Sequence, residues 1–223
     1  MNALSLATVG PKRLTEKIYD LLKRDIIECQ LEPGELLRES VVTQRYQIGH
    51  TPFREACHRL EAEGLIQILP HRGYLVASFS QKDIRDLFEL RMAIEPFAAE
   101  LAVERGNPDQ LKDLEENLGR ETRLVKTRPS NLIHSINWNN MRFHLNVARL
   151  ADNRELLNSV ENIHQKLMRT IMFTAKRAPN SQLLSTYHRD IVEAIKGRRA
   201  GVARKSMAKD IQSAQRWIRD CAG

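Results

Sequence analysis

Residues 50–77 read HTPFREACHRLEAEGLIQILPHRGYLVA, and this stretch decides the fold of the first part of the chain. It begins as a helix over about 50–63, because Pro52 falls in the first turn, where proline is tolerated, and Gly64 is a typical helix terminator. Two short runs of strand-forming residues follow, at 65–69 and 74–77, separated by the turn sequence PHRG. The pattern predicts a helix followed by a β-hairpin.

Two further helices are expected upstream of this stretch. Residues 13–29 place leucine and isoleucine at helical spacing, and Pro33-Gly34 ends the segment. A second, short helix fits about 39–46. Three helices and a hairpin make a winged helix-turn-helix, which we assign to residues 11–78, with residues 1–10 as a flexible tail.

From Ser80 onward the strand patterns disappear, and the chain reads as long amphipathic helices. Ser80 and Asp83 form a capping-box pattern that opens a helix to about residue 106, and Asn107-Pro108 opens the next, to about 126. We expect a loop over 127–134 and further helices at about 135–150, 153–177, 181–197 and 200–220. The predicted fold class is mainly α, with a bundle of about six helices over residues 79–223.

Composition excludes several classes of protein. A hydrophobic content of 42% over 223 residues is enough for a packed core, and no apolar run approaches the roughly 18 residues of a membrane span. The chain has only 3 cysteines and no C-x-x-C pair, which favours reduced thiols over a disulfide framework or a thiolate zinc site. We therefore expect a cytoplasmic protein that is not bound to a membrane.

Several short motifs run through both halves of the chain. In the first half they are Pro33-Gly34, Leu37 with Glu39, the run from Ile48 to Ala56, Glu63-Gly64-Leu65 and Arg72-Gly73. In the second half they are Leu90-Arg91-x-x-Ile94-Glu95-Pro96, Phe143-His144 and Asp152-Asn153. Together these motifs resemble the GntR family of bacterial transcription regulators, in its FadR-like subfamily with an all-helical effector domain of the FCD type.

The resemblance implies a DNA-binding regulator that is not an enzyme. By position, the family's base and phosphate contacts would fall on Ser40, His50, Thr51, Arg54, Arg72 and Gly73. His50 stands where the family usually has arginine, which implies a different operator or weaker binding, and Arg45 could supply the missing charge. The alternatives are an exposed charge or an ion pair with a neighbouring glutamate for Arg54, and a solvated turn for Arg72.

The charge distribution does not support this assignment by itself. The chain carries a formal net charge of +7, but residues 1–78 hold ten Lys or Arg and ten Asp or Glu, so the predicted DNA-binding half is neutral. We expect few phosphate contacts per protomer and a modest salt dependence. Residues 166–223 hold thirteen basic and four acidic residues, which indicates either a solvated surface or a field that attracts an anion.

Polar residues of the second half form a candidate metal site. Asn140 and His144 lie four residues apart and hence on one helix face, while His188 and Asp210 lie 22 residues apart on either side of a predicted turn, so they can meet if the last two helices are antiparallel. In the FadR-like proteins that the chain resembles, the corresponding positions are Asp, His, His and His, which bind a divalent metal that can hold a carboxylate effector. The resemblance implies a possible divalent ion such as zinc or nickel here; direct effector binding or a buried polar network are the alternatives.

Other residues of the bundle have less specific interpretations. Arg91 is a candidate partner for an effector carboxylate, with an ion pair to Glu95 as the alternative. His134 and His164 fit no ligand spacing and are interpreted as loop or helix-face residues. The aromatic residues are interpreted as core or pocket wall, namely Phe97, Trp138, Phe143 and Phe173.

These observations predict a ligand-responsive transcription factor, with repression as the expected sign of regulation. A homodimer would bind a palindromic double-stranded operator, and a small organic acid would bind in the bundle, which would also carry the dimer contacts. One alternative is a metal-dependent enzyme that uses His144, His188 and Asp210, although no nucleophile motif or phosphate loop accompanies them. The other is a DNA-binding protein without a ligand.

Overall fold

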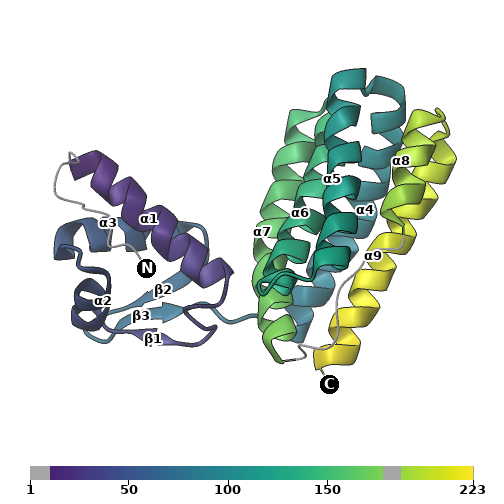
Figure 1. Ribbon diagram of the computed structural model, residues 1–223. Coiled ribbons are helices and arrows are strands. Elements are labelled where there is room, and N and C mark those ends of the chain that lie inside the picture. Colours follow the sequence, from purple (N-terminus) through teal and green to yellow (C-terminus); the bar gives the residue numbers. More distant parts are fainter. Residues whose placement is uncertain (1–10, 178–186, 223) are drawn as a thin grey trace. The chain divides into compact units, whose positions relative to one another are not determined.

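The computed structural model describes residues 11–177 and 187–222, and it divides into two compact units whose boundary lies between Phe79 and Ser80. The expected tail at 1–10 lies outside the described residues. The first unit contains α1 (Pro11–Ile27), α2 (Glu39–Tyr46), α3 (His50–Ala62) and a three-stranded antiparallel sheet of β1 (Leu36–Leu37), β2 (Ile66–Leu69) and β3 (Gly73–Val76), as Figure 1 shows. The predicted winged helix-turn-helix is confirmed.

Strand β1 was not predicted. It has only two residues, which is too short for an alternating pattern, and it forms because Leu36 pairs with Leu75 and Leu37 pairs with Tyr74. The sheet order is therefore β1-β3-β2, with the hairpin strand β3 in the centre. The turn between β2 and β3 is the wing. Because β3 pairs with β1, the wing hairpin is attached to the segment that leads into α2.

The core of this unit holds α3 against the sheet and α1. Phe53, in the first turn of α3, is fully buried, and its ring meets the Tyr74 ring of β3 edge-on with centroids 5.0 Å apart. Ile18, Leu22 and Ile26 of α1 pack into the same cluster. Because Phe53 anchors the first turn of α3 in this core, its immediate neighbours on the exposed side of the helix are held in place.

Gly73, at the start of β3, requires glycine for two reasons. Its φ is +118°, and a Cβ atom at this position would lie 2.5 Å from the backbone oxygen of Leu37. We expect Gly73→Ala to reduce the free energy of unfolding by roughly 2 kcal/mol or more, as measured by denaturant unfolding. Gly34→Ala is the control, because Gly34 has a φ of +81° but no atom within 4 Å of the added methyl; equal losses would contradict the clash.

The second unit consists, within the described residues, of six helices. They are α4 (Gln81–Arg105), α5 (Pro108–Thr127), α6 (Leu132–Leu150), α7 (Arg154–Arg177), α8 (His188–Lys196) and α9 (Ala200–Ala222). The predicted starts of α4 and α5 are confirmed, since Ser80 and Asp83 form a capping box and the Asn107 side chain accepts a hydrogen bond from the Gln110 amide. The bundle prediction is therefore confirmed.

The start of helix α6 differs clearly from the prediction. Helix α6 begins at Leu132, inside the predicted loop, because turn hydrogen bonds from the Leu132 amide to Pro129 and from the Ser135 amide to Asn131 already close its first turn. Helix α8 is described from His188, and its predicted start at 181 lies outside the described residues.

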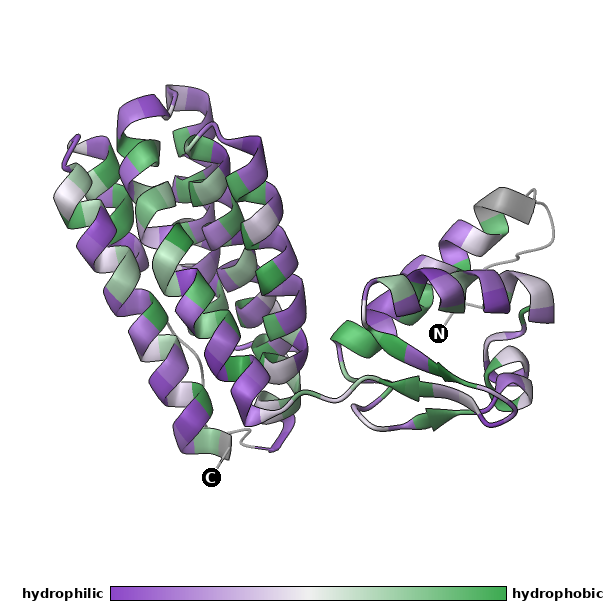
Figure 2. Ribbon diagram, turned by 180° about the vertical axis from the view of Figure 1, so that it is seen from behind, coloured by the Kyte–Doolittle hydropathy of each residue, from purple (hydrophilic) through white to green (hydrophobic). Residues whose placement is uncertain are grey.

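Helix α4 lies at the centre of this unit, in contact with α6, α7, α8 and α9. Hydrophobic and hydrophilic residues alternate along the bundle helices in Figure 2, as expected for helices with one buried and one exposed face. Phe143 is fully buried, but the core interpretation of Phe97 is wrong: it is 45% exposed, because its neighbours Glu95, Pro96 and Ala98 occupy the inner face. No helix among the described residues has both the length and the hydrophobicity to cross a bilayer.

Candidate functional site

The predicted DNA contacts of the first unit lie on exposed parts of three elements. Ser40 is in the first turn of α2, while His50, Thr51 and Arg54 are in the first turns of α3, and all four side chains are exposed. The N-terminal turns of a recognition helix are the part that reaches base edges in a helix-turn-helix. The placement therefore suits the predicted contacts.

Glu39 connects these turns to each other. One of its carboxylate oxygens lies 2.6 Å from His50 Nδ1, and both accept hydrogen bonds from Arg54 Nε, at 3.0 and 3.1 Å. The Tyr74 hydroxyl donates to the same carboxylate at 3.3 Å. The structure thus contains the glutamate ion pair that was the alternative for Arg54, while leaving the Arg54 side chain 62% exposed and within reach of a further partner.

The charges in this group support one another. The hydrogen bond from Arg54 and the contact with His50 lower the pKa of Glu39, although partial burial acts in the opposite direction. The Glu39 carboxylate in turn raises the pKa of Arg54. Both groups are therefore ionised at neutral pH, and DNA must compete with Glu39 for the guanidinium.

The remaining predicted DNA contacts are more widely placed. Arg72 is exposed in the turn between β2 and β3, next to the half-buried Gly73. Arg45 lies in the last turn of α2, with its guanidinium 5.3 Å from the centre of the Tyr46 ring. Arg45 is exposed but occupies the opposite end of α2 from Ser40.

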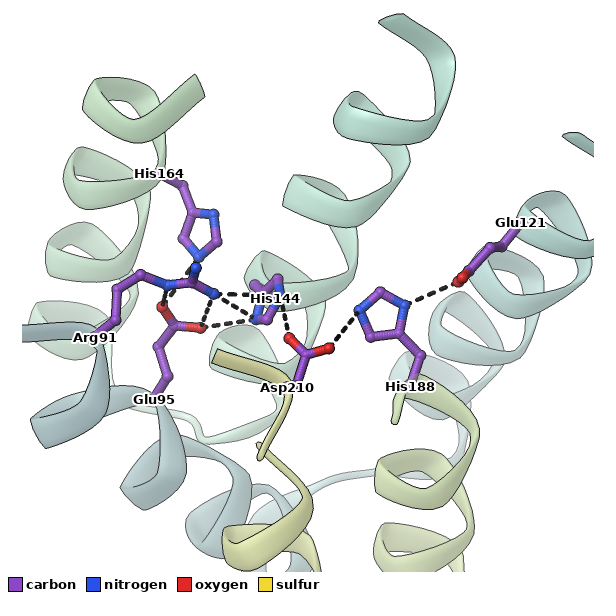
Figure 3. A network of polar contacts seen from close by, with 7 residues as sticks. All are labelled: Arg91, Glu95, Glu121, His144, His164, His188 and Asp210. Atoms are coloured by element: carbon purple, nitrogen blue, oxygen red, sulfur yellow. Dashed lines mark hydrogen bonds and ion pairs between the residues drawn. The ribbon is translucent and has the colours of Figure 1, made fainter. Parts of the chain in front are cut away.

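In the second unit, three of the four predicted ligands converge from three helices (Figure 3). His144 of α6 points Nε2 at Asp210 of α9, at 3.3 Å from Oδ2, and His188 of α8 points Nε2 at Oδ1 of the same carboxylate, at 3.9 Å. All three side chains are at least 95% buried. The predicted meeting of His188 and Asp210 across two antiparallel helices is therefore found in the structure.

Each of the two imidazoles has a second carboxylate on its other nitrogen. Glu95 of α4 lies 2.7 Å from His144 Nδ1, and Glu121 of α5 lies 2.8 Å from His188 Nδ1. A carboxylate that accepts a hydrogen bond from Nδ1–H fixes the tautomer in which the Nε2 lone pair is available to a ligand. Both rings thus have the orientation that metal-binding histidines have in proteins.

Arg91 and His164 complete the network at the Glu95 end. Arg91 Nε donates to Glu95 at 2.5 Å, and its Nη2 lies 3.4 Å from His144 Nε2, so the ion-pair alternative for Arg91 is present. His164 of α7 lies 3.1 Å from Glu95 through Nε2, and its ring stacks on His144 with centroids 4.8 Å apart. His164 thus lies on a helix face, as one of the two interpretations had it, and that face is the buried one of α7. His134 lies on α6 and accepts a hydrogen bond from the Trp138 indole.

The donor set of this cluster fits a divalent ion. The candidate ligand atoms of His144, His188 and Asp210 lie within 4.8 Å of one another. Tetrahedral N and O ligands about 2.1 Å from one zinc ion are roughly 3.4 Å apart, so the side chains would have to draw slightly closer together around an ion. Glu95, His144 and His164 form a second triad with the same property, but the Arg91 guanidinium neutralises its carboxylate. Asn140 is buried one turn before His144, and no described residue forms a hydrogen bond with its side chain, so the structure does not join it to the other three predicted ligands.

Burial and charge shift the pKa values of the network in different directions. Burial alone would raise the pKa of Glu95, but the charges of Arg91, His164 and His144 lower it well below its usual range. Burial opposes protonation of His144, yet Glu95 and Asp210 together raise its pKa. Without a metal, the protonated His144 ring therefore donates to Glu95 through Nδ1 and to Asp210 through Nε2.

His164 provides a test of this electrostatic description. Burial, reinforced by the charge of Arg91, lowers its pKa from 6.5 to about 4, so between these values the unfolded chain binds a proton that the folded chain does not. The contribution of His164 to the free energy of unfolding therefore decreases as the pH falls through this range. We expect His164→Gln, which retains a donor for Glu95, to have a flatter stability profile from pH 6.5 to 4 in chelator-treated protein, measured by urea unfolding; an unchanged profile would contradict the shift.

Sequence reasoning missed Glu121 and His164 and treated Glu95 only as a partner of Arg91. The i, i+4 spacing of Arg91 and Glu95 was visible in the sequence. The contacts of Glu121 with His188 and of His164 with Glu95 span 67 and 69 residues and depend on how α5 and α7 pack, for which no local pattern exists.

The order of the two units along the chain agrees with comparisons to known proteins. The family model "Bacterial regulatory proteins, gntR family" matches residues 14–76, and the model "FCD domain" matches residues 86–213, which is more than half of the chain. The HTH-type transcriptional repressor RspR of Escherichia coli K12 is 28% identical over 206 residues, which cover 92% of this chain and 89% of that protein.

Further relatives agree with this result. The HTH-type transcriptional repressor GlaR of Escherichia coli K12 is 40% identical over 96 residues, 43% of this chain and 44% of that protein. Among solved structures, E. coli McbR/YncC has the same fold, with a TM-score of 0.78 at 19% identity over 97% of this chain and 100% of the other. The relatives are transcriptional regulators and not enzymes. From its winged helix-turn-helix, its helical bundle and both family matches, this chain belongs to the GntR family of bacterial transcription regulators, with the FCD architecture of the FadR-like subfamily.

Proposed function

We propose that this regulator is a ligand-responsive repressor, which binds a palindromic operator as a homodimer and responds to a small carboxylate metabolite bound in its helical bundle. The observation that carries the proposal is the convergence of two carboxylate-bound imidazoles on Asp210 (Figure 3). Burying so many ionisable groups is costly, and apolar side chains would hold the helices together at least as well. A binding role explains why the bundle contains them.

In this proposal His144, His188 and Asp210 hold a divalent ion such as zinc or nickel. Two imidazole nitrogens and one carboxylate suit such ions, and three protein ligands leave coordination positions open. When bound, the ion supplies a positive charge to which an effector carboxylate can bind. Asn140, on the same helix as His144, remains a predicted fourth ligand.

Arg91 has a supporting role at this site. Its guanidinium compensates the charge of Glu95, with which it forms two hydrogen bonds, and lies beside His144. Glu95 can therefore orient His144 while remaining ionised. Arg91 is also the nearest buried cation to the ligand triad among the network residues, and it is the predicted second contact for an effector carboxylate.

The operator would be bound by the exposed turns of α2 and α3 and by the wing. The relatives named as repressors support the sign of regulation, and the palindromic operator follows from a two-fold symmetric dimer. An effector changes operator affinity only if it binds the DNA-competent and DNA-incompetent arrangements with different free energies. Such a coupling is typically about 1–3 kcal/mol, or a change of about 5- to 150-fold in affinity.

The proposal is tested by combining thermal shift with operator binding. An operator is selected from random double-stranded DNA, and a panel of small carboxylates is screened for stabilisation of the zinc-loaded protein. We expect at least one carboxylate to stabilise the zinc-loaded protein more than chelator-treated protein, and to change operator affinity measured by fluorescence anisotropy. Stabilisation by none of them would favour the ligand-free DNA-binding protein instead, and zinc-dependent turnover of one of them would favour the enzyme.

A further inference from the structure

A pocket lies over helices α5 and α6, outside the polar network. It has a volume of about 440 Å³, and its lining includes Arg120 of α5 and Trp138, Met141, Arg142, Leu145 and Arg149 of α6. This volume is in the range of small-molecule sites. None of these residues belongs to the network around Asp210, so the pocket is a separate feature of the bundle.

The α6 side of the pocket is a single stripe of the helix. Trp138, Arg142, Leu145 and Arg149 follow one another at intervals of four, three and four residues, which places them on one face. Apolar and cationic side chains therefore alternate along the wall. Arg142 and Arg149 are two turns apart, which corresponds to a rise of roughly 10 Å along the axis, so they can meet different groups of one ligand.

The charge of the pocket is positive throughout. Three guanidiniums line it and no acidic residue does, and none of the three forms an ion pair with an acid among residues 11–177 and 187–222. Exposed cations elsewhere on the bundle do form such pairs, as Arg204 does with Glu100 and Lys196 does with Glu115. The three guanidiniums therefore offer hydrogen-bond donors that suit an anion, and no acidic side chain of the described residues pairs with them.

Arg149 is held in position by buried amides. Its Nη1 donates to Asn146 at 2.6 Å, and the Asn146 amide nitrogen donates to Asn117 of α5 at 2.7 Å. Asn117 and Asn146 are each only 4% exposed, and Asn117 also exchanges hydrogen bonds with Asn139, which lines the pocket. The Arg149 and Asn139 side chains are therefore already held in place by hydrogen bonds, which reduces the entropy that they lose when a ligand binds.

We propose that this pocket is a second ligand site, which binds a small organic acid with at least two carboxylates on an apolar body. A guanidinium can bind a carboxylate in a bidentate manner. Arg120, Arg142 and Arg149 come from two helices and from different turns of α6, so they can bind more than one carboxylate. Trp138, Met141 and Leu145 cover the apolar body. A two-fold contact between two copies centred on this stripe would bring like charges together, which makes self-association the less favourable occupant.

The test uses isophthalate, a benzene ring with two carboxylates, and inorganic phosphate as the comparison anion. Trp217→Phe leaves Trp138 as the one tryptophan of the chain, so that its fluorescence reports the pocket. We expect saturable quenching by isophthalate, weakened roughly tenfold or more by Arg142→Gln. Lys205→Gln is the matched control, because it removes one exposed positive charge from α9 and is expected to leave the titration unchanged.

The proposal would be overturned by an absence of saturable quenching or by phosphate binding as tight as isophthalate binding. It would also be overturned by an equal effect of Lys205→Gln and Arg142→Gln, or by a change of native mass in Arg142→Gln with an unchanged titration. His188→Ala separates this site from the metal site: we expect it to retain isophthalate binding. Loss of binding in His188→Ala but not in Arg142→Gln would place the ligand in the polar network and reject the second site, whereas failure of the metal site alone leaves the titration intact.

Discussion

Replacing Arg54 by alanine is expected to weaken operator binding by about 1–3 kcal/mol per half-site, which is about 5- to 150-fold. Arg54 lies in the first turns of α3, where a recognition helix meets base edges, and its side chain is 62% exposed. The affinity of the protein for zinc and for carboxylates should remain unchanged, because the affected residue belongs to the other compact unit. Fluorescence anisotropy with the selected operator measures the first effect, and thermal shift measures the second.

The control for this prediction is Lys17→Ala, which removes one exposed positive charge from α1 of the same unit. If Lys17→Ala weakened binding as much as Arg54→Ala, the loss would reflect overall charge and not a specific contact. Unfolding of the variant does not complicate the comparison, since Arg54 contacts the rest of the unit through Glu39 on an exposed surface. An Arg54→Ala protein with unchanged operator affinity would reject α3 as the recognition helix.

Helices and their boundaries were largely predictable because they depend on local patterns. The range of α2 was predicted to the residue, and the capping box at Ser80 gave the start of α4. Strand β1 was not predictable, because two residues carry no period and the strand exists only through its pairing with β3. The start of α6 was missed for a similar reason, since turn bonds to Pro129 and Asn131 extend the helix into a segment without apolar spacing.

The candidate sites were predictable only in part. The motif around Thr51 and Arg54 located the exposed turns of α3, but not the Glu39 carboxylate that holds Arg54 and His50, because that contact depends on the angle between α2 and α3. In the bundle, the helical rise per residue predicted that His188 and Asp210 would meet. The carboxylates behind the imidazoles come from α4 and α5, and only the packed structure brings them there.

Helix α6 shows why the sequence predicted the buried polar site of this unit but not the pocket on its surface. His144 points into the bundle, whereas Arg142 and Arg149 point into the pocket with Arg120, and the two sets share one helix. A histidine within an apolar stripe indicates a buried polar group and hence a candidate site. Arginines on an exposed stripe have the pattern of an ordinary solvated surface. Their lack of acidic partners among the described residues became visible only after packing placed α5 beside α6.

The removal of a ligand imidazole is expected to have the largest effect on the bundle. His188→Ala should abolish stabilisation by zinc, which for the unaltered protein at a free zinc concentration of 100 times Kd is about 2.7 kcal/mol. The physical reason is that only two protein ligands, His144 and Asp210, would remain in the triad. Thermal unfolding with zinc and with chelator measures the effect, and equal zinc stabilisation in both proteins would reject the site.

Glu121→Gln tests the same site without the risk of disturbing the core, because Glu121 lies near the surface and the Gln side-chain oxygen can still accept a hydrogen bond from His188 Nδ1–H. Loss of the negative charge should make the imidazole a weaker ligand and reduce zinc affinity by roughly 10- to 100-fold, measured by competition with a chromophoric chelator. Glu116→Gln, an exposed change on the same helix α5, should leave the affinity unchanged.

Zinc should also bind less tightly as the pH falls, since Glu95 and Asp210 raise the pKa of His144 and a proton then competes with the metal for that ring. A zinc affinity that is the same in Glu121→Gln and Glu116→Gln, and insensitive to acid, would mean that the imidazoles converge on Asp210 only as a buried polar network.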